Sequence, residues 1–154
     1  MTGVQTCALP IYHIFKIPVL NFIFRTAKTI PIASAKEDPQ ALERAYDEVA
    51  KALADGDLVG IFPEGKITSD GDMNEFKSGI KRIVDRTPVP VIPLALRGLW
   101  GSFFSRMGGK AMSRFFPRGL SPKIGLVAGP AVAAKDVTPE SLRATVLALR
   151  GDSK

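Results

Sequence analysis

Cysteine, histidine and long apolar runs are scarce in this sequence of 154 residues. The single cysteine, Cys7, excludes an internal disulfide framework, and with the single histidine, His13, it cannot supply the ligand set of a structural zinc site. The closest candidate for a membrane span, residues 11–24, is interrupted by charged, polar and proline positions, whereas a span needs roughly eighteen uninterrupted apolar residues. We therefore predict one globular domain with no bound metal and no membrane-spanning helix.

Acidic residues are missing from one long segment of a basic chain, whose net charge is +6 and whose sequence pI is near 9.7. Between Arg97 and Lys123 there are six cations, five aromatic residues and no aspartate or glutamate. Cations interleaved with aromatics are typical of a surface that docks on an anionic bilayer, so we predict peripheral membrane contact through this segment. The alternative is a solvated basic excursion whose aromatic side chains cover a sheet edge.

Single-stranded nucleic acid is a rival partner for a basic domain with exposed aromatic residues. The sequence carries no RNA-recognition, helix-turn-helix or zinc-finger signature. Nucleic-acid binding would also leave the two apolar blocks described below without an explanation. We therefore predict that the chain has no nucleic-acid partner.

Apolar segments and helical patterns alternate along the chain. A helix is expected over Pro39–Asp55, because Asp38 and Pro39 form a start signal and Gly56 suits a left-handed C-terminal cap. The other predicted elements are a helix over Ile14–Thr26, strands over Ile30–Ala33, Leu58–Phe62, Val89–Leu96 and Lys123–Val127, a helix over Ser78–Arg86, and a terminal helix from Pro139 through Leu149. This alternation predicts an α/β fold with a mainly parallel open sheet flanked by helices.

The turn that follows the predicted strand Leu58–Phe62 is the candidate site. Gly60, Gly65 and Lys66 imitate the spacing of a phosphate-binding P-loop, but Ile67 stands where that motif needs serine or threonine, so a nucleotide site is not expected. Ligands of open α/β sheets bind past the carboxyl ends of the strands, where this turn would place a cation. The alternative is an ordinary strand-to-loop turn with a solvated lysine.

Two sequence blocks carry a resemblance to a known family. Phe62-Pro63-Glu64-Gly65 is followed further along the chain by Val89-Pro90-Val91-Ile92-Pro93. Together they resemble the third and fourth blocks of the lysophosphatidic acid acyltransferase (PlsC-like) family, and the resemblance extends from about Tyr12 to Val132. The run Leu96–Arg106 looks like the branch of that family fused to transporter or acyl-carrier-protein synthetase modules.

The resemblance implies an enzyme that moves a fatty acyl group from a thioester, on coenzyme A or acyl carrier protein, to a lysophospholipid hydroxyl without a further cofactor. It implies that Glu64, Gly65 and Lys66 hold the glycerol-phosphate group of the acceptor, since lysine binds phosphate as a point charge and glycine allows close approach. The implied binding site also includes Phe62, Pro63, Thr68 and Pro93. The implied location is the cytoplasmic face of the bacterial inner membrane, peripherally or within a larger membrane protein.

The sequence departs from the family where the chemistry is expected. The family's general base is the histidine of a His-x-x-x-x-Asp block, whereas the fifth position after His13 is Pro18, and Ser34 stands where an arginine for the acceptor phosphate is expected. The first residues match no part of the family, so we predict a non-native or unstructured leader over 1–11 and a partial acyltransferase domain over 12–154 that lacks its N-terminal catalytic segment. We assign no catalytic residue and expect an inactive chain; the alternative is a fragment that binds anionic lipid without chemistry.

Overall fold

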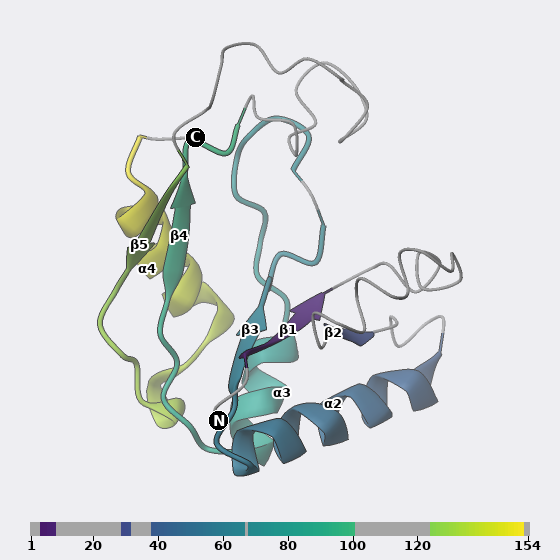
Figure 1. The fold of residues 1–154 in the computed structure, drawn as a ribbon. Coiled ribbons are helices and arrows are strands. Elements are labelled where there is room, and N and C mark those ends of the chain that lie inside the picture. Colours follow the sequence, from purple (N-terminus) through teal and green to yellow (C-terminus); the bar gives the residue numbers. More distant parts are fainter. Residues whose placement is uncertain (1–3, 9–28, 32–37, 67, 101–123, 153–154) are drawn as a thin grey trace.

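The computed structural model describes residues 4–8, 29–31, 38–66, 68–100 and 124–152 (Figure 1). The strands are β1 (Val4–Ala8), β2 (Thr29–Pro31), β3 (Leu58–Ile61), β4 (Leu94–Arg97) and β5 (Gly125–Ala128). The α-helices are α2 (Pro39–Ala54), α3 (Gly79–Arg86) and α4 (Pro139–Arg150), and a short 3-10 helix covers Ala134–Asp136. The described residues thus mix helices and strands, as an α/β fold requires.

Two separate sheets are formed. The first is parallel, with strand order β2-β1-β3, and Cys7 of β1 lies between Ile30 of β2 and Ile61 of β3. The second is an antiparallel pair of β4 and β5, in which Ala95 is opposite Val127. In Figure 1 the β4–β5 pair and α4 occupy one side, and the parallel sheet with α2 and α3 occupies the other.

The prediction of one mainly parallel open sheet that includes Val89–Leu96 is therefore wrong for the described residues. Only Leu94–Arg97 forms a strand there, and its partner β5 runs antiparallel; Val91 adds an isolated antiparallel bridge to Val132. Proline explains the shortening, because Pro90 and Pro93 in this segment have no N–H to donate to a sheet ladder. Consequently, β3 and β4 are not neighbouring parallel strands.

The three helix predictions that fall on described residues agree with the structure within one residue at each end. The N-terminus of α2 is capped by Asp38, whose carboxylate accepts the Ala41 N–H at 2.9 Å, and Pro39 occupies the first turn. Gly56 has φ = +82°, the left-handed conformation expected just beyond the helix. α4 begins with a capping box between Thr138 and Ser141.

The expectations for the N-terminal part of the chain stay predictions. Val4–Ala8 form the middle strand of the parallel sheet, although they belong to the segment expected as a leader. The boundary at residue 12 stays a prediction. The helix expected over Ile14–Thr26, His13, Ser34 and residues 101–123 of the basic segment lie outside the described residues.

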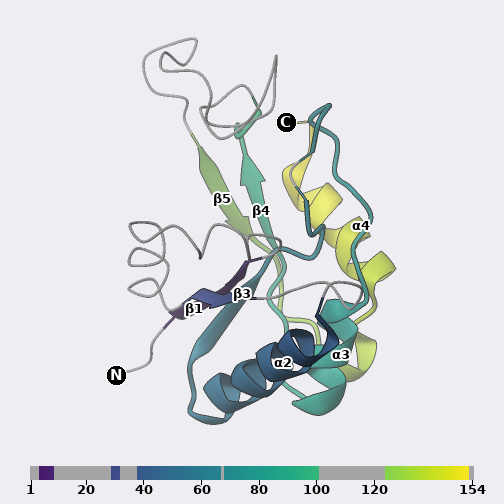
Figure 2. The same cartoon turned by 90° about the vertical axis from the view of Figure 1, so that its right-hand side faces the viewer.

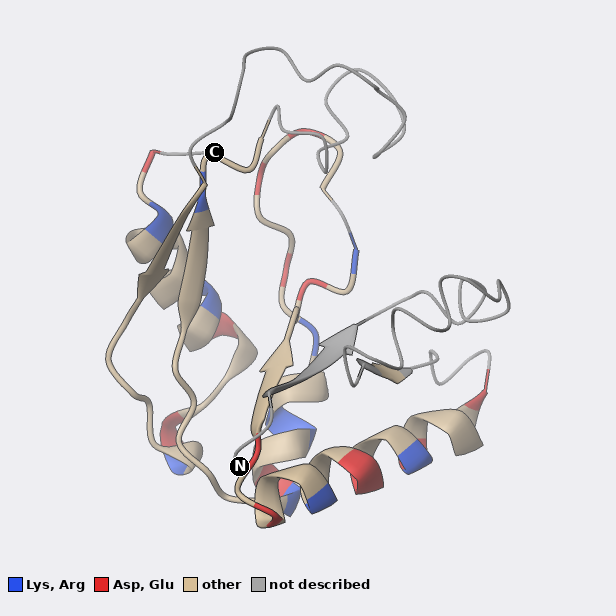
Figure 3. Ribbon diagram, viewed as in Figure 1, with Lys and Arg blue, Asp and Glu red and all other residues tan. Residues whose placement is uncertain are grey.

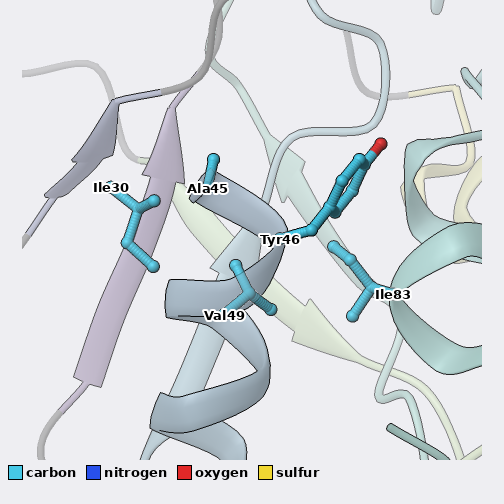
Figure 4. Close-up of a cluster of buried hydrophobic side chains, with 5 residues drawn as sticks. All are labelled: Ile30, Ala45, Tyr46, Val49 and Ile83. Atoms are coloured by element: carbon cyan, nitrogen blue, oxygen red, sulfur yellow. The ribbon is translucent and has the colours of Figure 1, made fainter. Parts of the chain in front are cut away.

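The first core cluster joins α2 to the parallel sheet and to α3 (Figure 4). Its buried residues are Ile30, Ala45, Tyr46, Val49 and Ile83. Val49 is 1% exposed, and the partly buried Val59 and Ile61 of β3 pack against this cluster. The guanidinium of Arg86 lies 5.3 Å from the centre of the Tyr46 ring, a cation–π contact between α3 and α2.

The second core cluster joins α3 to the start of α4 through Ile80, Val84, Val137 and Leu142. Further along, α4 packs against the β4–β5 pair, which turns its other face away from the helix (Figure 2). That other face carries exposed apolar side chains, namely those of Leu94, Leu96 and Leu126. No helix among the described residues is long and apolar enough to cross a bilayer.

Candidate functional site

The connection between β3 and α3, residues 62–78, holds the candidate site. It leaves the C-terminal end of β3 and returns to α3 (Figure 1). The connection begins with a tight turn, in which the Gly65 N–H donates to the Phe62 carbonyl at 3.2 Å and Gly65 has φ = +65°. A second hydrogen bond, from the Lys77 N–H to the Pro63 carbonyl at 2.9 Å, joins the two ends of the connection.

Glu64 fixes the connection across its width. One carboxylate oxygen, Oε2, accepts the backbone N–H of Asn74 at 2.7 Å and the Asn74 side-chain amide at 3.1 Å. Hydrogen bonds to a carboxylate are stronger than neutral ones, and these are partly shielded from water. The negative charge of Glu64 is therefore already engaged within the protein and holds the turn that carries Gly65 and Lys66.

An open cleft of about 510 Å³ lies beside this turn. Its lining includes three cations and two carboxylates; the full set is Glu64, Lys66, Met73, Asn74, Glu75, Phe76, Lys77 and Arg143. Figure 3 shows acidic and basic positions along the β3–α3 connection, with basic positions on α4. Within the described part of the chain, neither the Lys66 nor the Lys77 ammonium forms a hydrogen bond or ion pair. Both are available to an anionic ligand.

Lys77 lies directly over the glycine turn. A methyl group added at Gly65 would lie 2.8 Å from the Lys77 Nζ and 3.0 Å from its Cε. The side chain of Lys77 thus occupies the space where a side chain at Gly65 would lie, next to Lys66 in the sequence. This packing brings two lysines from opposite ends of the connection to one cleft.

Arg143 reaches the cleft from α4. Its Nε donates to the Asn74 carbonyl at 3.0 Å, and its Nη2 donates to the Met73 carbonyl at 2.9 Å. Seven residues further along the same helix, the Nη1 of Arg150 donates to the Gly71 carbonyl at 3.2 Å. The C-terminal helix therefore holds residues 71–74 of the connection through backbone carbonyl groups.

The residues predicted for the site have different positions. Glu64 and Lys66 line the cleft, and Gly65 lies buried beneath Lys77. Phe62 is 57% exposed, and Pro63 supplies the carbonyl that holds Lys77. These positions test the geometry only, and the role of each residue toward a substrate stays a prediction.

Thr68 and Pro93 lie apart from the cleft lining. The Thr68 hydroxyl accepts the Gly71 N–H at 3.2 Å and donates to Asp70 at 2.7 Å, so it shapes a local turn. Pro93 is buried, and its carbonyl accepts the Gly129 N–H at 2.9 Å beside β5. Their predicted places in the binding site rest on the family resemblance alone.

Sequence reasoning missed Asn74, Lys77 and Arg143. Lys77 could have been considered, because it closes the connection only eleven residues after Lys66 and just before the predicted helix. Asn74 pairs with a residue ten positions away and Arg143 with residues 69 and 70 positions away. No periodicity or spacing in the sequence indicates such contacts, since they depend on how α4 packs.

Comparisons with known proteins point to one family. The family model described as Acyltransferase matches residues 6–97. The 1-acyl-sn-glycerol-3-phosphate acyltransferase BAT2 of Brassica napus is 32% identical over 85 residues, which are 55% of this chain and 24% of that protein. An N-acylphosphatidylethanolamine synthase of Arabidopsis thaliana is 33% identical over 87 residues, which are 54% of this chain and 30% of that protein.

A solved structure shares the fold. The crystal structure of the 1-acyl-sn-glycerophosphate acyltransferase PlsC from Thermotoga maritima matches with a TM-score of 0.58 and 23% identity, over 94% of this chain and 53% of that one. The chain spans about a quarter to a third of the length of the curated relatives that it matches. The α/β fold is therefore that of an acyltransferase domain.

Proposed function

We propose, because the chain belongs to the Acyltransferase family, that its cleft binds the phosphate group of a lysophospholipid acceptor. In the reaction, the free hydroxyl oxygen of the acceptor attacks the carbonyl carbon of an acyl thioester on coenzyme A or acyl carrier protein. The new ester bond forms as the carbon–sulfur bond breaks, and the hydroxyl proton ends on the released thiol. The described residues would position the acceptor for this attack.

One observation carries the proposal: two lysine ammonium groups without a partner among the described residues line the cleft together with Arg143, and Glu64, one of its two carboxylates, is already engaged. Glu64 would repel a phosphate if its charge were unpaired, but Asn74 donates two hydrogen bonds to it. Lys66 and Lys77 remain as point charges of the kind that bind phosphate. The acceptor's head group, which carries that phosphate, is the part of the substrate that this charge pattern suits.

Binding of the acceptor does not require that this chain complete the reaction. Histidine is absent from the described residues, and His13 lacks the aspartate five positions on that the family pattern requires. We therefore propose that the chain as written binds the acceptor without turnover. Its second candidate function, a non-catalytic module for anionic lipid, follows from the same cleft and the same charges.

Calorimetric titration with sn-glycerol 3-phosphate tests the cleft, and glycerol is the uncharged control ligand. Lys66→Ala should raise Kd about tenfold, the equivalent of about 1.4 kcal/mol, because it removes one charge-assisted contact. Lys51→Ala is the matched control, since it removes an exposed lysine from the far end of α2. Equal Kd values for Lys66→Ala and the unchanged chain would remove Lys66 from the site.

An assay of thiol release separates binding from chemistry. With acyl-coenzyme A and lysophosphatidic acid, we expect no release above the protein-free rate, since the sequence lacks the base pattern. Turnover that Lys66→Ala weakens would show that the chain is active after all and that its base lies elsewhere. In that case the binding proposal would stand and the inactivity proposal would fall.

Membrane contact is a further part of the proposed function. The segment from Arg97 to Lys123 connects β4 to β5, whose exposed face bears Leu94, Leu96 and Leu126, the last 65% exposed. Apolar side chains on two strands, joined in sequence by a basic, aromatic segment, suit the interface of an anionic bilayer. We propose peripheral docking there, at the cytoplasmic face of a bacterial inner membrane.

Sedimentation with vesicles tests the docking surface. Binding should be stronger to anionic than to neutral vesicles and should fall with added salt, because each cation near the surface contributes about 1 kcal/mol. Leu126→Ser should weaken binding, whereas Leu58→Ser, a control at a similarly exposed leucine (64%) on β3, should not. Equal binding to both kinds of vesicle would contradict the electrostatic part of the proposal.

A further inference from the structure

We propose that Arg143 of α4 is a positioning residue, which holds the β3–α3 connection in the conformation that binds the acceptor. The inference rests on the proposed function, because it takes the cleft as the acceptor's phosphate site. α4 lies beyond residues 6–97, the part that the family model matches. The role is therefore assigned by the contacts of this chain rather than by its family blocks.

Arg143 donates hydrogen bonds to two successive backbone carbonyl groups. The Nε and Nη2 donors of its planar guanidinium point to the Asn74 and Met73 oxygens at 3.0 and 2.9 Å, in a partly buried setting. A fork of two parallel N–H donors fixes the orientation of its partner as well as its distance. The peptide between Met73 and Asn74 is thus held in position relative to α4.

Asn74 links Arg143 to the turn of residues 62–66, which we call the lysine turn. Its carbonyl accepts from Arg143, while its own N–H and side-chain amide both donate to Glu64. Hydrogen bonds in such a series polarise and strengthen one another. Glu64 in turn belongs to the tight turn of Gly65, next to Lys66. Arg143 therefore acts on the lysine turn through Asn74 and Glu64.

The support itself is rigid. Two side chains of α4, Leu142 and Val146, are 4% and 9% exposed, and Leu142 packs with residues of α3 in the second core cluster. The Thr138–Ser141 capping box fixes the start of the helix one turn before Arg143. Arg143 therefore extends from an anchored backbone, and its side chain is long enough to reach the cleft.

Hydrogen exchange of the ligand-free chain tests the positioning directly. The amide of Asn74 donates to Glu64, so its exchange reports whether the connection is held. Arg143→Ala should speed exchange of this amide about tenfold or more. Arg82→Ala, which removes an exposed arginine from α3, is the matched control and should leave the rate unchanged. An unchanged Asn74 rate in Arg143→Ala would overturn the proposal.

Titration with sn-glycerol 3-phosphate then separates positioning from direct charge. Arg143→Lys keeps the positive charge but not the planar fork, so we expect both Arg143→Ala and Arg143→Lys to raise Kd about tenfold at a temperature where each is folded. Full binding by Arg143→Lys would mean that only charge matters and would contradict a positioning role. Should Arg143→Ala fail to fold, Arg143→Lys decides alone through the same exchange and binding measurements.

The two proposals fail in different ways. If the unchanged chain does not bind sn-glycerol 3-phosphate, the proposed acceptor site is wrong, but the exchange rate of Asn74 still shows whether Arg143 holds the connection. If the unchanged chain binds and Arg143→Ala binds equally well, the acceptor site stands and the positioning role is wrong.

Discussion

Gly65→Ala is the substitution that most directly tests the architecture of the lysine turn. Gly65 has φ = +65°, and a methyl group there would lie 2.8, 3.0 and 3.1 Å from the Nζ, Cε and Cδ of Lys77. The change therefore acts twice: it strains the backbone and it pushes Lys77 away from the turn. Only the displacement of Lys77 should change the Kd for the ligand.

The backbone strain in Gly65→Ala has its own free-energy cost. An L-residue in the left-handed region costs roughly 1–2 kcal/mol, and alanine recovers about 0.4–1 kcal/mol because it has fewer unfolded conformations than glycine. The net loss is about 1 kcal/mol. Moving Lys77 adds little to the free energy of folding, since its flexible side chain is mostly exposed. Gly65→Ala should therefore lower Tm by about 2–4 °C.

Gly56→Ala is the matched control. Gly56 has φ = +82°, but a methyl group there meets no atom within 4 Å. It should show the same net loss of about 1 kcal/mol from strain alone. The two variants should thus have similar Tm values, whereas only Gly65→Ala should weaken the binding of sn-glycerol 3-phosphate, by about three- to tenfold.

Thermal unfolding followed by circular dichroism, together with calorimetric titration, gives both quantities for each variant. Equal Kd values for Gly65→Ala and Gly56→Ala would refute the reasoning that Lys77 must lie over Gly65 to serve the cleft. A much larger loss of Tm in Gly65→Ala would show instead that Lys77 cannot move aside and that the turn is more tightly packed than its exposure indicates.

Two further substitutions test the packing that supports the site. Val49→Ala removes two methyl carbons from a side chain that is 1% exposed, and should lower the free energy of unfolding by about 2 kcal/mol in urea denaturation; a loss below about 0.5 kcal/mol would contradict its place in the core. Thr138→Ala removes the N-cap of α4 and should cost about 1 kcal/mol in the same measurement, while Thr145→Ala, whose hydroxyl donates to the Ser141 carbonyl of the same helix, should cost less.

The helices could be predicted from the sequence because their signals are local. The cap at Asp38 and the glycine at position 56 bracket α2, and both signals lie within one turn of the helix end. The same holds for Thr138 at the start of α4. In each case neighbouring residues satisfy the backbone groups, so the sequence alone contains the cause.

The sheet could not be predicted in the same way, since strand pairing joins distant residues. Val89–Leu96 has the apolar run of a buried parallel strand, but its prolines cannot donate, and the segment that pairs with β4 comes from beyond residue 124. Val4–Ala8 carries no marked strand signal in sequence, yet it pairs with both β2 and β3. Pairing outweighed local pattern in both places.

The residues of the candidate site likewise fall into two groups, those with a local sequence signal and those whose role depends on tertiary packing. Glu64 and Lys66 follow the end of a strand, where a ligand site is expected, and both line the cleft. Asn74 and Arg143 have no such local signal, because their contribution depends on where α4 packs. The family blocks therefore locate the lysine turn, and the tertiary structure locates what holds it.

If Arg143 supports the lysine turn, then binding at the cleft and docking of α4 are linked, and the link must act in both directions. A ligand that needs the held conformation stabilises it by RT ln(1 + [L]/Kd), about 1.4 kcal/mol at ten times Kd. Exchange of α4 amides near Arg143 should then slow about tenfold on saturation with sn-glycerol 3-phosphate, although the ligand contacts none of those amides. Exchange in α2, which contributes no residue to the cleft, should slow only as far as global unfolding does. Equal slowing in both helices would mean that the ligand stabilises the whole domain without passing through Arg143, and that α4 holds the cleft no more specifically than any other helix does.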